Sequence, residues 1–346
     1  MKEALYKKVV ITSVREETKN FKIFTLEPEG LIHYKAGQYL TLVHQPGPKE
    51  VRRSYSMISA PLLHEPVAIG VKRMDNGVFS RQLIDHAKPG DELVTTGTGG
   101  FFTLPETIEA YQQVIFFAAG AGITPIYSLL KTCLHLHPHL RVMLVYSNSS
   151  PERTAFLQPV KELSESFKER FTLHLLFSNQ PNLREARLNR DLLLELFDRC
   201  ADIPVAKTLV YVCGPESYIR MVTFVLQERG VPPTLIRREN FIVPPRPAAI
   251  HPPDTADRKV FVKLGDQEMT VEVHYPDSIL RAAKKQGFVL PYSCEAGRCG
   301  NCAARCVSGS VWHSYNEVLT ERELKDGYIL TCTGHPVGGD VHLLIG

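Results

Sequence analysis

The spacing of apolar residues changes character twice along this chain of 346 residues. Up to about residue 105, short apolar or alternating runs are separated by glycine and proline turns, a pattern typical of antiparallel strands. The runs are 8–14, 21–26, 39–44, 67–71 and 92–96. This spacing predicts an antiparallel β-barrel or sandwich over residues 1–106.

From residue 107 to 240, apolar strands alternate with helices. The first strand is the continuous apolar run 114–119, which is typical of a parallel strand buried on both faces. Helices are expected at 125–136, 159–167, 190–199 and 216–228, and further strands at 141–146, 171–177, 208–213 and 234–238. This alternation predicts a doubly wound α/β domain.

A proline-rich segment, 241–257, predicts a semi-rigid linker between domains. In the last part, 258–346, strands are expected at 259–264, 269–274 and 340–345 and a helix at 279–286. Five of the eight cysteines fall in the final 53 residues. The expected fold class is therefore multidomain, with a cysteine-rich domain after the barrel and the α/β domain.

Composition narrows the setting of the protein. The net charge of +3 is small, and no apolar run reaches the 18 residues of a membrane span. The first residues lack the apolar stretch of a signal peptide. We therefore expect a cytoplasmic protein with neither a nucleic acid nor a membrane as partner. Because cytosolic thiols stay reduced, clustered cysteines indicate metal binding rather than disulfides.

Four cysteines have the spacing of an iron–sulfur site. Cys294, Cys299 and Cys302 form the pattern C-x4-C-x2-C, and 29 residues separate Cys302 from Cys332. This is the plant-type [2Fe–2S] ligand spacing. A tight loop must wrap the cluster with three thiolates, and the glycines at 297 and 300 permit the backbone turns that this needs.

A structural zinc site is the alternative, since zinc sites also use cysteine pairs. Only one cysteine lies downstream at a suitable distance, and His313 and His335 do not form a paired motif. Cys306 is expected to be a buried thiol rather than a ligand. The segment 291–302 resembles plant-type ferredoxins, and this resemblance over residues 258–346 implies a β-grasp fold and a one-electron carrier.

Three short motifs follow one another in the first domain: R-S-Y-S at 53–56, V-K-R at 71–73 and G-V-F-S at 77–80. In this order they resemble the flavin domain of the ferredoxin–NADP reductase family, most of whose members use FAD rather than FMN. The resemblance implies a flavin site made of Arg53, Ser54, Tyr55, Ser56, Val71, Lys72, Gly77, Val78, Phe79 and Ser80.

The chemistry of these side chains suits that site. Arg53 offers a cation to the flavin diphosphate, and Tyr55 offers a ring to stack on the isoalloxazine. Ser56 is expected near flavin N5, the atom that accepts hydride. Gly77 lets the backbone approach phosphate, and Ser80 is expected to donate its hydroxyl to phosphate at a helix start.

Two glycine turns each join an apolar strand to a helix. The first, G-A-G-I-T-P at 120–125, has Pro125 where G-x-G-x-x-G has its third glycine. This departure argues against an ordinary Rossmann dehydrogenase and matches the reductase family, in which a second turn, C-G-P, lies under the nicotinamide. The expected nucleotide site comprises Gly120, Gly122, Thr124, Pro125, Arg153, Cys213, Gly214 and Pro215.

The choice of coenzyme turns on a pocket for the 2′-phosphate. Hydroxyls at 147–150 and Arg153 follow the second strand of the α/β domain, and Ser178, Arg184 and Arg187 follow the third. These groups favour NADPH, because they can hold a phosphate and no carboxylate stands directly after the second strand.

Two residues at the end of the α/β domain complete the expected site. In the family, an acid and an aromatic residue here approach the flavin, so Glu239 is expected to pass protons and Phe241 to cover the ring. Together with Ser56, Thr124 and Cys213, Glu239 makes up the expected catalytic set.

Over nearly its whole length, the chain resembles reductase components of bacterial oxygenases of the phenylacetyl-CoA monooxygenase reductase type. The resemblance implies a flavoprotein oxidoreductase, with electrons passing from NAD(P)H to FAD, to [2Fe–2S] and on to a partner protein, the oxygenase of a multicomponent monooxygenase. The first alternative is a general electron donor to a hybrid cluster protein, a cytochrome P450 or a desaturase. The second is a non-catalytic binding protein with a structural metal. A monomer is expected.

Overall fold

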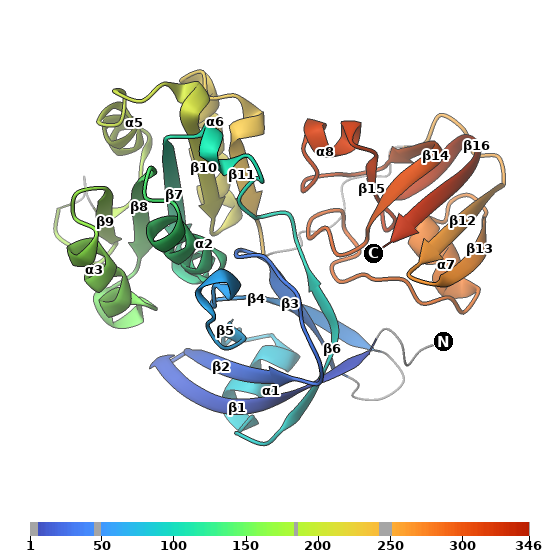
Figure 1. The fold of residues 1–346 in the computed structure, drawn as a ribbon, viewed down its shortest axis with the longest axis horizontal. Coiled ribbons are helices and arrows are strands. Elements are labelled where there is room, and N and C mark those ends of the chain that lie inside the picture. The colour runs from blue at the N-terminus through green and yellow to red at the C-terminus, as the bar shows by residue number, and fades with distance from the viewer. Residues whose placement is uncertain (1–5, 45–49, 183–185, 242–250, 346) are drawn as a thin grey trace. The chain divides into compact units, whose positions relative to one another are not determined.

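A computed structural model describes residues 6–44, 50–182, 186–241 and 251–345. The chain divides into two units (Figure 1). The larger unit comprises Lys8–Thr98 and Phe102–Ile242, and the smaller comprises Met1–Lys7, Gly99–Phe101 and Val243–Gly346. Much of the expected linker, 242–250, lies outside the described residues. Within the described ranges, no helix is long and apolar enough to cross a membrane.

The first part of the larger unit is a six-stranded sheet with the order β4-β3-β6-β1-β2-β5. Its strands are β1 (Lys7–Thr18), β2 (Phe21–Pro28), β3 (Tyr39–His44), β4 (Val51–Ser56), β5 (Ala68–Lys72) and β6 (Glu92–Gly99). A bridge between Met57 and Ile69 joins the two edge strands and closes the sheet into a barrel. Helix α1 (Val78–His86) packs on β5.

The second part is a five-stranded sheet with the order β11-β10-β7-β8-β9, in which every pair is parallel. Its strands are β7 (Gln113–Ala119), β8 (Arg141–Asn148), β9 (Phe171–Phe177), β10 (Thr208–Cys213) and β11 (Ile236–Glu239). The helices that accompany them are α2 (Ile123–Leu136), α3 (Leu157–Ser166), α5 (Arg190–Asp198) and α6 (Glu216–Glu228) (Figure 1).

Strand β7 is apolar from residue 114 to 119 because both of its faces are buried. Phe116 and Ala118 point into the core that contains α2, whereas Ile115 and Phe117 point into the opposite core with α5 and α6. The chain runs from β7 outward to β9 and then returns to β10 on the other side of β7. In such sheets a ligand binds at the carboxyl ends of the two strands where the order reverses, which here are β7 and β10.

The barrel and the α/β part are held together by buried polar contacts. The Ser128 hydroxyl on α2 donates a hydrogen bond to the Ser59 carbonyl (2.6 Å). The backbone N–H of Phe156 donates to Glu17 Oε1 on β1 (2.8 Å). A side chain on Gly70 of β5 would lie 2.8 Å from the Thr124 methyl group. The glycine turn at 120–125 therefore lies directly against the barrel.

The smaller unit holds a five-stranded sheet with the order β13-β12-β16-β14-β15. Its strands are β12 (Arg258–Leu264), β13 (Gln267–Val273), β14 (Ala303–His313), β15 (Tyr328–Leu330) and β16 (Gly334–Ile345), with helices α7 (Ile279–Lys285) and α8 (Glu321–Lys325). Helix α7 buries Ile279, Leu280, Ala282 and Ala283 in the core of this unit. The mixed sheet with a packed helix has the form of a β-grasp fold.

Several elements were not expected from the sequence. Strand β14 has no apolar pattern that would predict a strand, because residues 307–310 are exposed. Its pairing with β16 is also irregular around Ser308. Helix α1 and strand β4 were marked only by motifs. Cys306, expected to be buried, is half-buried, and its thiol donates to the Ser308 carbonyl (3.4 Å) within the same irregular stretch.

Candidate functional site

The two glycine turns meet backbone to backbone at the carboxyl ends of β7 and β10. A Cβ atom on Gly122 would lie 2.1 Å from the carbonyl oxygen of Cys213 and 2.9 Å from the nitrogen of Gly214. Only glycine therefore fits at position 122 without moving the backbone of the second turn. Thr124 is buried, and its hydroxyl donates to the Ala121 carbonyl (2.9 Å).

Pro125 lies in the first turn of α2, where a helix has no partner for the missing N–H. Gly120 adopts a positive φ of 55°, and a Cβ there would lie 3.8 Å from Lys72 Nζ. The backbone of the first turn is thus open on the side of Lys72. A phosphate-bearing ligand can approach from this side, because a helix N-terminus and a cation both face it.

A cavity of about 690 Å³ opens at this edge of the sheet. It is bounded by the β1–β2 turn, the 119–121 turn, the loops after β8 and β9, and the start of α6. Four cations line it and make no ion pair within the described residues: Lys19, Lys72, Arg153 and Arg187. The size and charge suit a dinucleotide.

Three of the four serines predicted for a 2′-phosphate pocket also line this cavity, Ser150 does not, and Arg184 lies outside the described residues. Ser147, Ser149 and Ser178 line it with Asn148. One carboxylate, Glu152, lines it as well, and hydrogen bonds from the Ser150 hydroxyl and a backbone N–H lower its pKa. The β1–β2 turn that supplies Lys19 was not identified from the sequence.

Strand β4 positions the predicted flavin residues on the barrel. Burial raises the pKa of Tyr55, and its ring meets Phe79 edge-on at 6.1 Å. The Ser54 hydroxyl lies 3.0 Å from the Thr41 hydroxyl on β3, and Ser56 is buried. Arg53 is exposed and donates to the neighbouring backbone carbonyl (2.7 Å). An aromatic ring and a cation thus stand side by side on one strand.

The G-V-F-S turn forms the start of α1, but the Ser80 hydroxyl is used within the turn. It donates to the Gly77 carbonyl (3.2 Å) and accepts from the Met74 N–H (3.2 Å). A Cβ on Gly77 would lie 2.4 Å from the Ser80 hydroxyl oxygen. Val78 is exposed at the first position of the helix. Ser80 therefore shapes the turn and does not cap the helix, whose first N–H groups can bind an anion.

The three residues of the V-K-R motif lie in three different environments. Val71 is fully buried in the barrel core. Lys72 is exposed at the cavity. Arg73 forms an ion pair with Asp85 of α1, with 3.0 Å between Nη2 and Oδ2. Of the two cations, Lys72 is the one available to a ligand in this cavity.

Cys213 and Glu239 are paired in register at the carboxyl ends of β10 and β11. The Oε2 atom of Glu239 is buried without a hydrogen-bond partner among the described residues. Burial raises the pKa of Glu239 to about 8, and burial together with the Glu239 charge raises the pKa of the Cys213 thiol well above its usual value. Glu239 can therefore hold or release a proton near neutral pH. Phe241 is about half exposed, at 47%.

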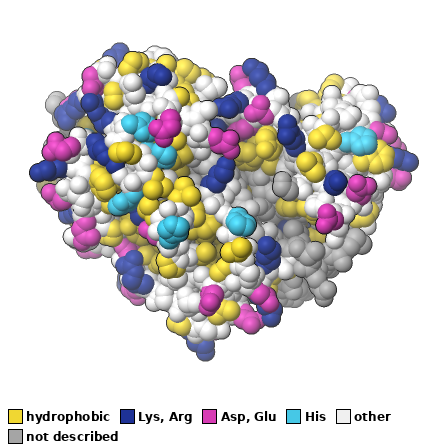
Figure 2. Space-filling model, in the orientation of Figure 1, with side chains coloured by type: hydrophobic (Ala, Val, Ile, Leu, Met, Phe, Trp, Pro, Cys, Tyr) yellow, Lys and Arg dark blue, Asp and Glu magenta, His cyan; other side chains and the backbone are white. Residues whose placement is uncertain are grey.

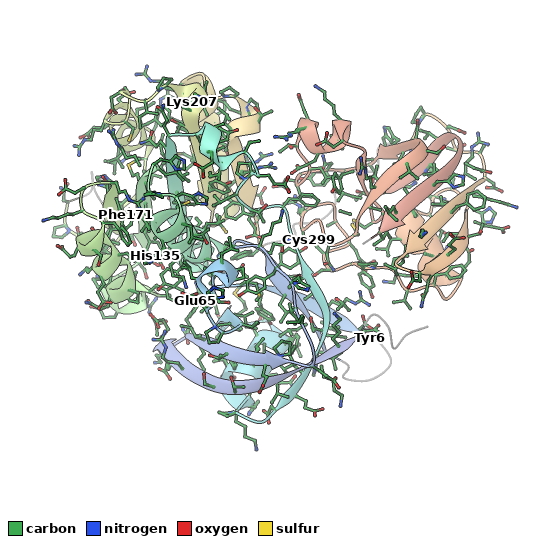
Figure 3. All side chains as sticks on the ribbon, viewed as in Figure 1. Tyr6, Glu65, His135, Phe171, Lys207 and Cys299 are labelled. Atoms are coloured by element: carbon green, nitrogen blue, oxygen red, sulfur yellow. The ribbon has the colours of Figure 1, made fainter. Side chains whose placement is uncertain are left out.

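The four predicted cysteines come together in the smaller unit, where Figure 3 marks Cys299. Cys299 is hydrogen-bonded to Cys294 and Cys302 to Cys332, so the sulfur atoms form two pairs. Among the described residues, no three of these sulfur atoms lie within 4.8 Å of one another. A single tetrahedral zinc ion would hold all four within about 4 Å. Two pairs fit two irons instead.

The loop around Cys294 has the backbone that a cluster needs. The hydrogen bond from Cys299 and backbone N–H groups of 296, 298 and 299 lower the pKa of Cys294 to about 6, against the effect of burial. Gly297 and Gly300 adopt positive φ values of 72° and 77°. A Cβ on Gly297 would lie 2.6 Å from the Tyr315 carbonyl oxygen. The thiolate form of Cys294 is thus favoured, while the same pairing and burial raise the pKa of Cys299.

One feature of this loop was not predicted from the sequence. Arg298 stands between two predicted ligands in the chain, and its largely buried side chain pairs with Glu317 (Nη1 to Oε2, 2.9 Å). The Tyr315 hydroxyl donates to the same carboxylate oxygen (2.8 Å) and lies 3.0 Å from Arg298 Nη2. Such a closed network could not be found from spacing, because Glu317 is 19 residues away and reaches the loop only through the fold.

Comparison with known proteins agrees with this geometry. Residues 7–104 match the oxidoreductase FAD-binding domain, residues 116–223 the oxidoreductase NAD-binding domain, and residues 262–337 the 2Fe-2S iron-sulfur cluster binding domain. A solved phthalate dioxygenase reductase, described as a modular structure for electron transfer from pyridine nucleotides to [2Fe-2S], shares the fold. Its TM-score is 0.60, with 24% identity and 99% coverage of both chains.

Two curated relatives are similar over most of their length. The ferredoxin reductase component of 3-ketosteroid-9-alpha-monooxygenase from Mycobacterium tuberculosis is 31% identical, covering 91% of this chain and 86% of the relative. One component of the 1,2-phenylacetyl-CoA epoxidase from Escherichia coli K12 is 28% identical, covering 96% of each. The predicted fold class, cofactors and enzyme class are confirmed. The chain belongs to the family of NAD(P)H-dependent flavoprotein oxidoreductases with a C-terminal [2Fe–2S] domain that serve as reductase components of oxygenases.

Proposed function

We propose that this protein oxidises NADPH and delivers the electrons one at a time to the oxygenase of a multicomponent monooxygenase. The observation that carries the proposal is the pairing of the four cysteine sulfurs in a chain that also has a dinucleotide cavity. A hydride carries two electrons. A bound flavin would supply the exchange between two-electron and one-electron transfer, and a bound cluster would supply one-electron transfer to the partner.

The protein's own residues then act by binding and orientation. We assign Arg53 to the flavin diphosphate and Tyr55 to the face of the ring, because the cation is exposed beside a sheltered aromatic side chain on β4. The N–H groups at the start of α1 complete the phosphate site, with the turn held by Ser80. Ser56 is assigned to the neighbourhood of flavin N5, and Phe241 to a cover of the ring.

At the nucleotide side, Thr124 and Cys213 are assigned to either side of the nicotinamide. Gly122 and Gly214 support this assignment, because their lack of side chains brings the two turns into contact. Cys213 stays a neutral thiol, since burial raises its pKa well above its usual value. Glu239 keeps a proton on its carboxyl group below about pH 8, so it is assigned to pass a proton near the site of hydride transfer.

NADPH is proposed over NADH because the cations at the cavity have no ion-pair partner in the part of the chain that the structure describes. Arg153 and Arg187 lie with the hydroxyls of Ser147, Ser149 and Ser178. A 2′-phosphate there would receive charge-assisted hydrogen bonds, which are about twice as strong as neutral ones. The carboxylate at this cavity, Glu152, is held by its own local hydrogen bonds.

The identity of the acceptor is tested by reconstitution. The loaded reductase is mixed with the oxygenase parts of phenylacetyl-CoA epoxidase or of 3-ketosteroid-9-alpha-monooxygenase, and NADPH oxidation is compared with product formed. Coupled product formation with either oxygenase supports the proposal. Rapid reduction of ferricyanide with no product from either oxygenase would favour a general electron donor instead.

A further inference from the structure

Three metal-ligating side chains converge on the α/β part at the edge of the sheet opposite to the dinucleotide cavity. Glu109 lies in a short 3-10 turn, Ile108–Ala110, just before β7. His137 and His139 lie in the turn that joins α2 to β8. The Nδ1 atom of His137 is 3.1 Å from Glu109 Oε1, and Nδ1 of His139 is 3.2 Å from Oε2. None of the three lines the cavity.

The turn that carries the two histidines is rigid. Pro138 separates them, which fixes the backbone between the two rings. The N–H of His137 donates to the Cys133 carbonyl (3.2 Å), and the N–H of Leu140 donates to the His137 carbonyl (3.1 Å). The Arg170 guanidinium donates to the carbonyls of residues 134, 137 and 140. The backbone that carries the two imidazoles is therefore already ordered, so metal binding costs little backbone conformational entropy there.

The donor atoms lie within reach of a single ion. Zinc bonds to imidazole nitrogen and carboxylate oxygen of about 2.0–2.2 Å place neighbouring donors on one ion about 3.3 Å apart. Each imidazole Nδ1 lies close to this distance from a different oxygen of Glu109 (3.1 and 3.2 Å), and one donor atom from each of the three residues lies within 4.8 Å of the others. Two imidazoles favour zinc over magnesium or calcium, which prefer oxygen ligands.

We propose that Glu109, His137 and His139 form a binding site for a divalent transition-metal ion, with Zn²⁺ as the natural occupant. Three protein ligands leave at least one position for water. The site joins the segment that leads into β7 to the α2–β8 turn. Both segments lie at the amino ends of strands, whereas hydride transfer is assigned to the carboxyl ends of β7 and β10. Its role is to fasten these two segments, so occupancy stabilises the larger unit without taking part in electron transfer.

The proposed metal site is open to solvent. Figure 2 shows histidine side chains spread over the visible face of the molecule, with acidic side chains next to some of them, and the three residues of the proposed site are exposed or half-buried. His137 is the most sheltered of the three, with 17% of its side chain exposed, and Glu109 is the most open, with 71%. A metal ion can therefore enter from solvent while the sheltered imidazole anchors it.

The test uses protein with its flavin and cluster loaded, treated with chelator to remove loosely bound metal, and titrated with ZnCl₂ by calorimetry. The variants are His137→Ala with His139→Ala together, and Glu109→Gln. His135→Ala is the matched control, because His135 is an exposed histidine on α2 that contacts Phe167 and not Glu109 (Figure 3). We expect one equivalent of Zn²⁺ in the wild type and in the control, and binding at least tenfold weaker in the other two variants.

X-ray absorption at the zinc edge makes the answer independent of how the variants fold. The wild type loaded with one equivalent should show two imidazoles and further light ligands, with no sulfur. Sulfur ligands would place the zinc at cysteines and overturn the proposal. Unchanged affinity and stoichiometry in the double variant would overturn it equally.

Discussion

Cys213 and Glu239 stand side by side at the ends of β10 and β11, where a carboxylate oxygen without a hydrogen-bond partner among the described residues lies next to a thiol that is fully buried. Such a pair is stable only while at least one member is neutral, because two buried negative charges would repel strongly. The pKa values of both groups are raised, so both carry protons at pH 7. Replacing either group should therefore alter the pH dependence of the reaction with the nicotinamide.

Glu239→Gln should remove an ionisation from the pH profile of flavin reduction. The carboxyl keeps its proton below about pH 8 and loses it above. Hydride transfer to the flavin leaves a positive charge on the nicotinamide, which a carboxylate beside the ring stabilises, so the wild-type rate should rise as pH rises through about 8. In stopped-flow experiments with NADPH, the glutamine variant should lack this rise. A rise of the same size in the variant would exclude Glu239 as the titrating group.

Gly122→Ala should disrupt the meeting of the two glycine turns. The added Cβ would lie 2.1 Å from a backbone carbonyl oxygen, so one turn must move. Overpacking of this kind costs about 1–3 kcal/mol of stability. We expect a lower melting temperature and a raised KM for NADPH. Gly339→Ala is the control, because nothing lies within 4 Å of its Cβ position. If both variants behave like the wild type, the turns do not have the described contact.

Arg153→Ala and Arg187→Ala should reduce the preference for NADPH. A hydrogen bond to a charged group contributes about 1.5–3 kcal/mol, which corresponds to a factor of about 10–150 in kcat/KM. The loss should affect NADPH and leave NADH nearly unchanged, because NADH lacks the 2′-phosphate. Arg141→Ala, whose guanidinium pairs with Asp202 instead, should alter neither. An unchanged ratio of the two kcat/KM values in both pocket variants would contradict the assignment.

The pair formed by Arg298 and Glu317 should set the reduction potential of the cluster. Glu317→Gln leaves the cation uncompensated between two ligands, so reduction becomes easier and the potential rises. Arg298→Met leaves the carboxylate uncompensated, so the potential falls. Shifts on the order of 59 mV correspond to a tenfold change in a one-electron equilibrium.

A redox titration followed by visible absorption measures both shifts. Tyr315→Phe is the control, since it removes a hydrogen bond to Glu317 without changing a charge, and its shift should be the smallest of the three. Shifts of the same sign in the two charge variants would show that loop distortion, rather than charge, determines the potential.

What could be predicted from the sequence was local. The cysteine loop could be identified because three of the four predicted ligands lie within nine residues. Strand β7 could be identified because burial on both faces makes its sequence a nearly continuous apolar run. The Ser80 hydroxyl was expected to meet phosphate, but its position relative to the Gly77 carbonyl is set by the turn. The cations around the cavity include Lys19 from the β1–β2 turn, which reaches the nucleotide side only because the barrel packs against α2. Contacts between distant segments leave no periodic pattern in the sequence.

The central claim is that electrons from NADPH reach an iron–sulfur cluster held by Cys294, Cys299, Cys302 and Cys332. It is tested most directly by adding NADPH to the anaerobic purified protein and recording visible absorption and low-temperature electron paramagnetic resonance. We predict that the flavin band bleaches and that a reduced [2Fe–2S] signal appears, close in amount to that given by dithionite. A flavin that bleaches without any cluster signal, or protein that contains zinc in place of iron, would contradict the account.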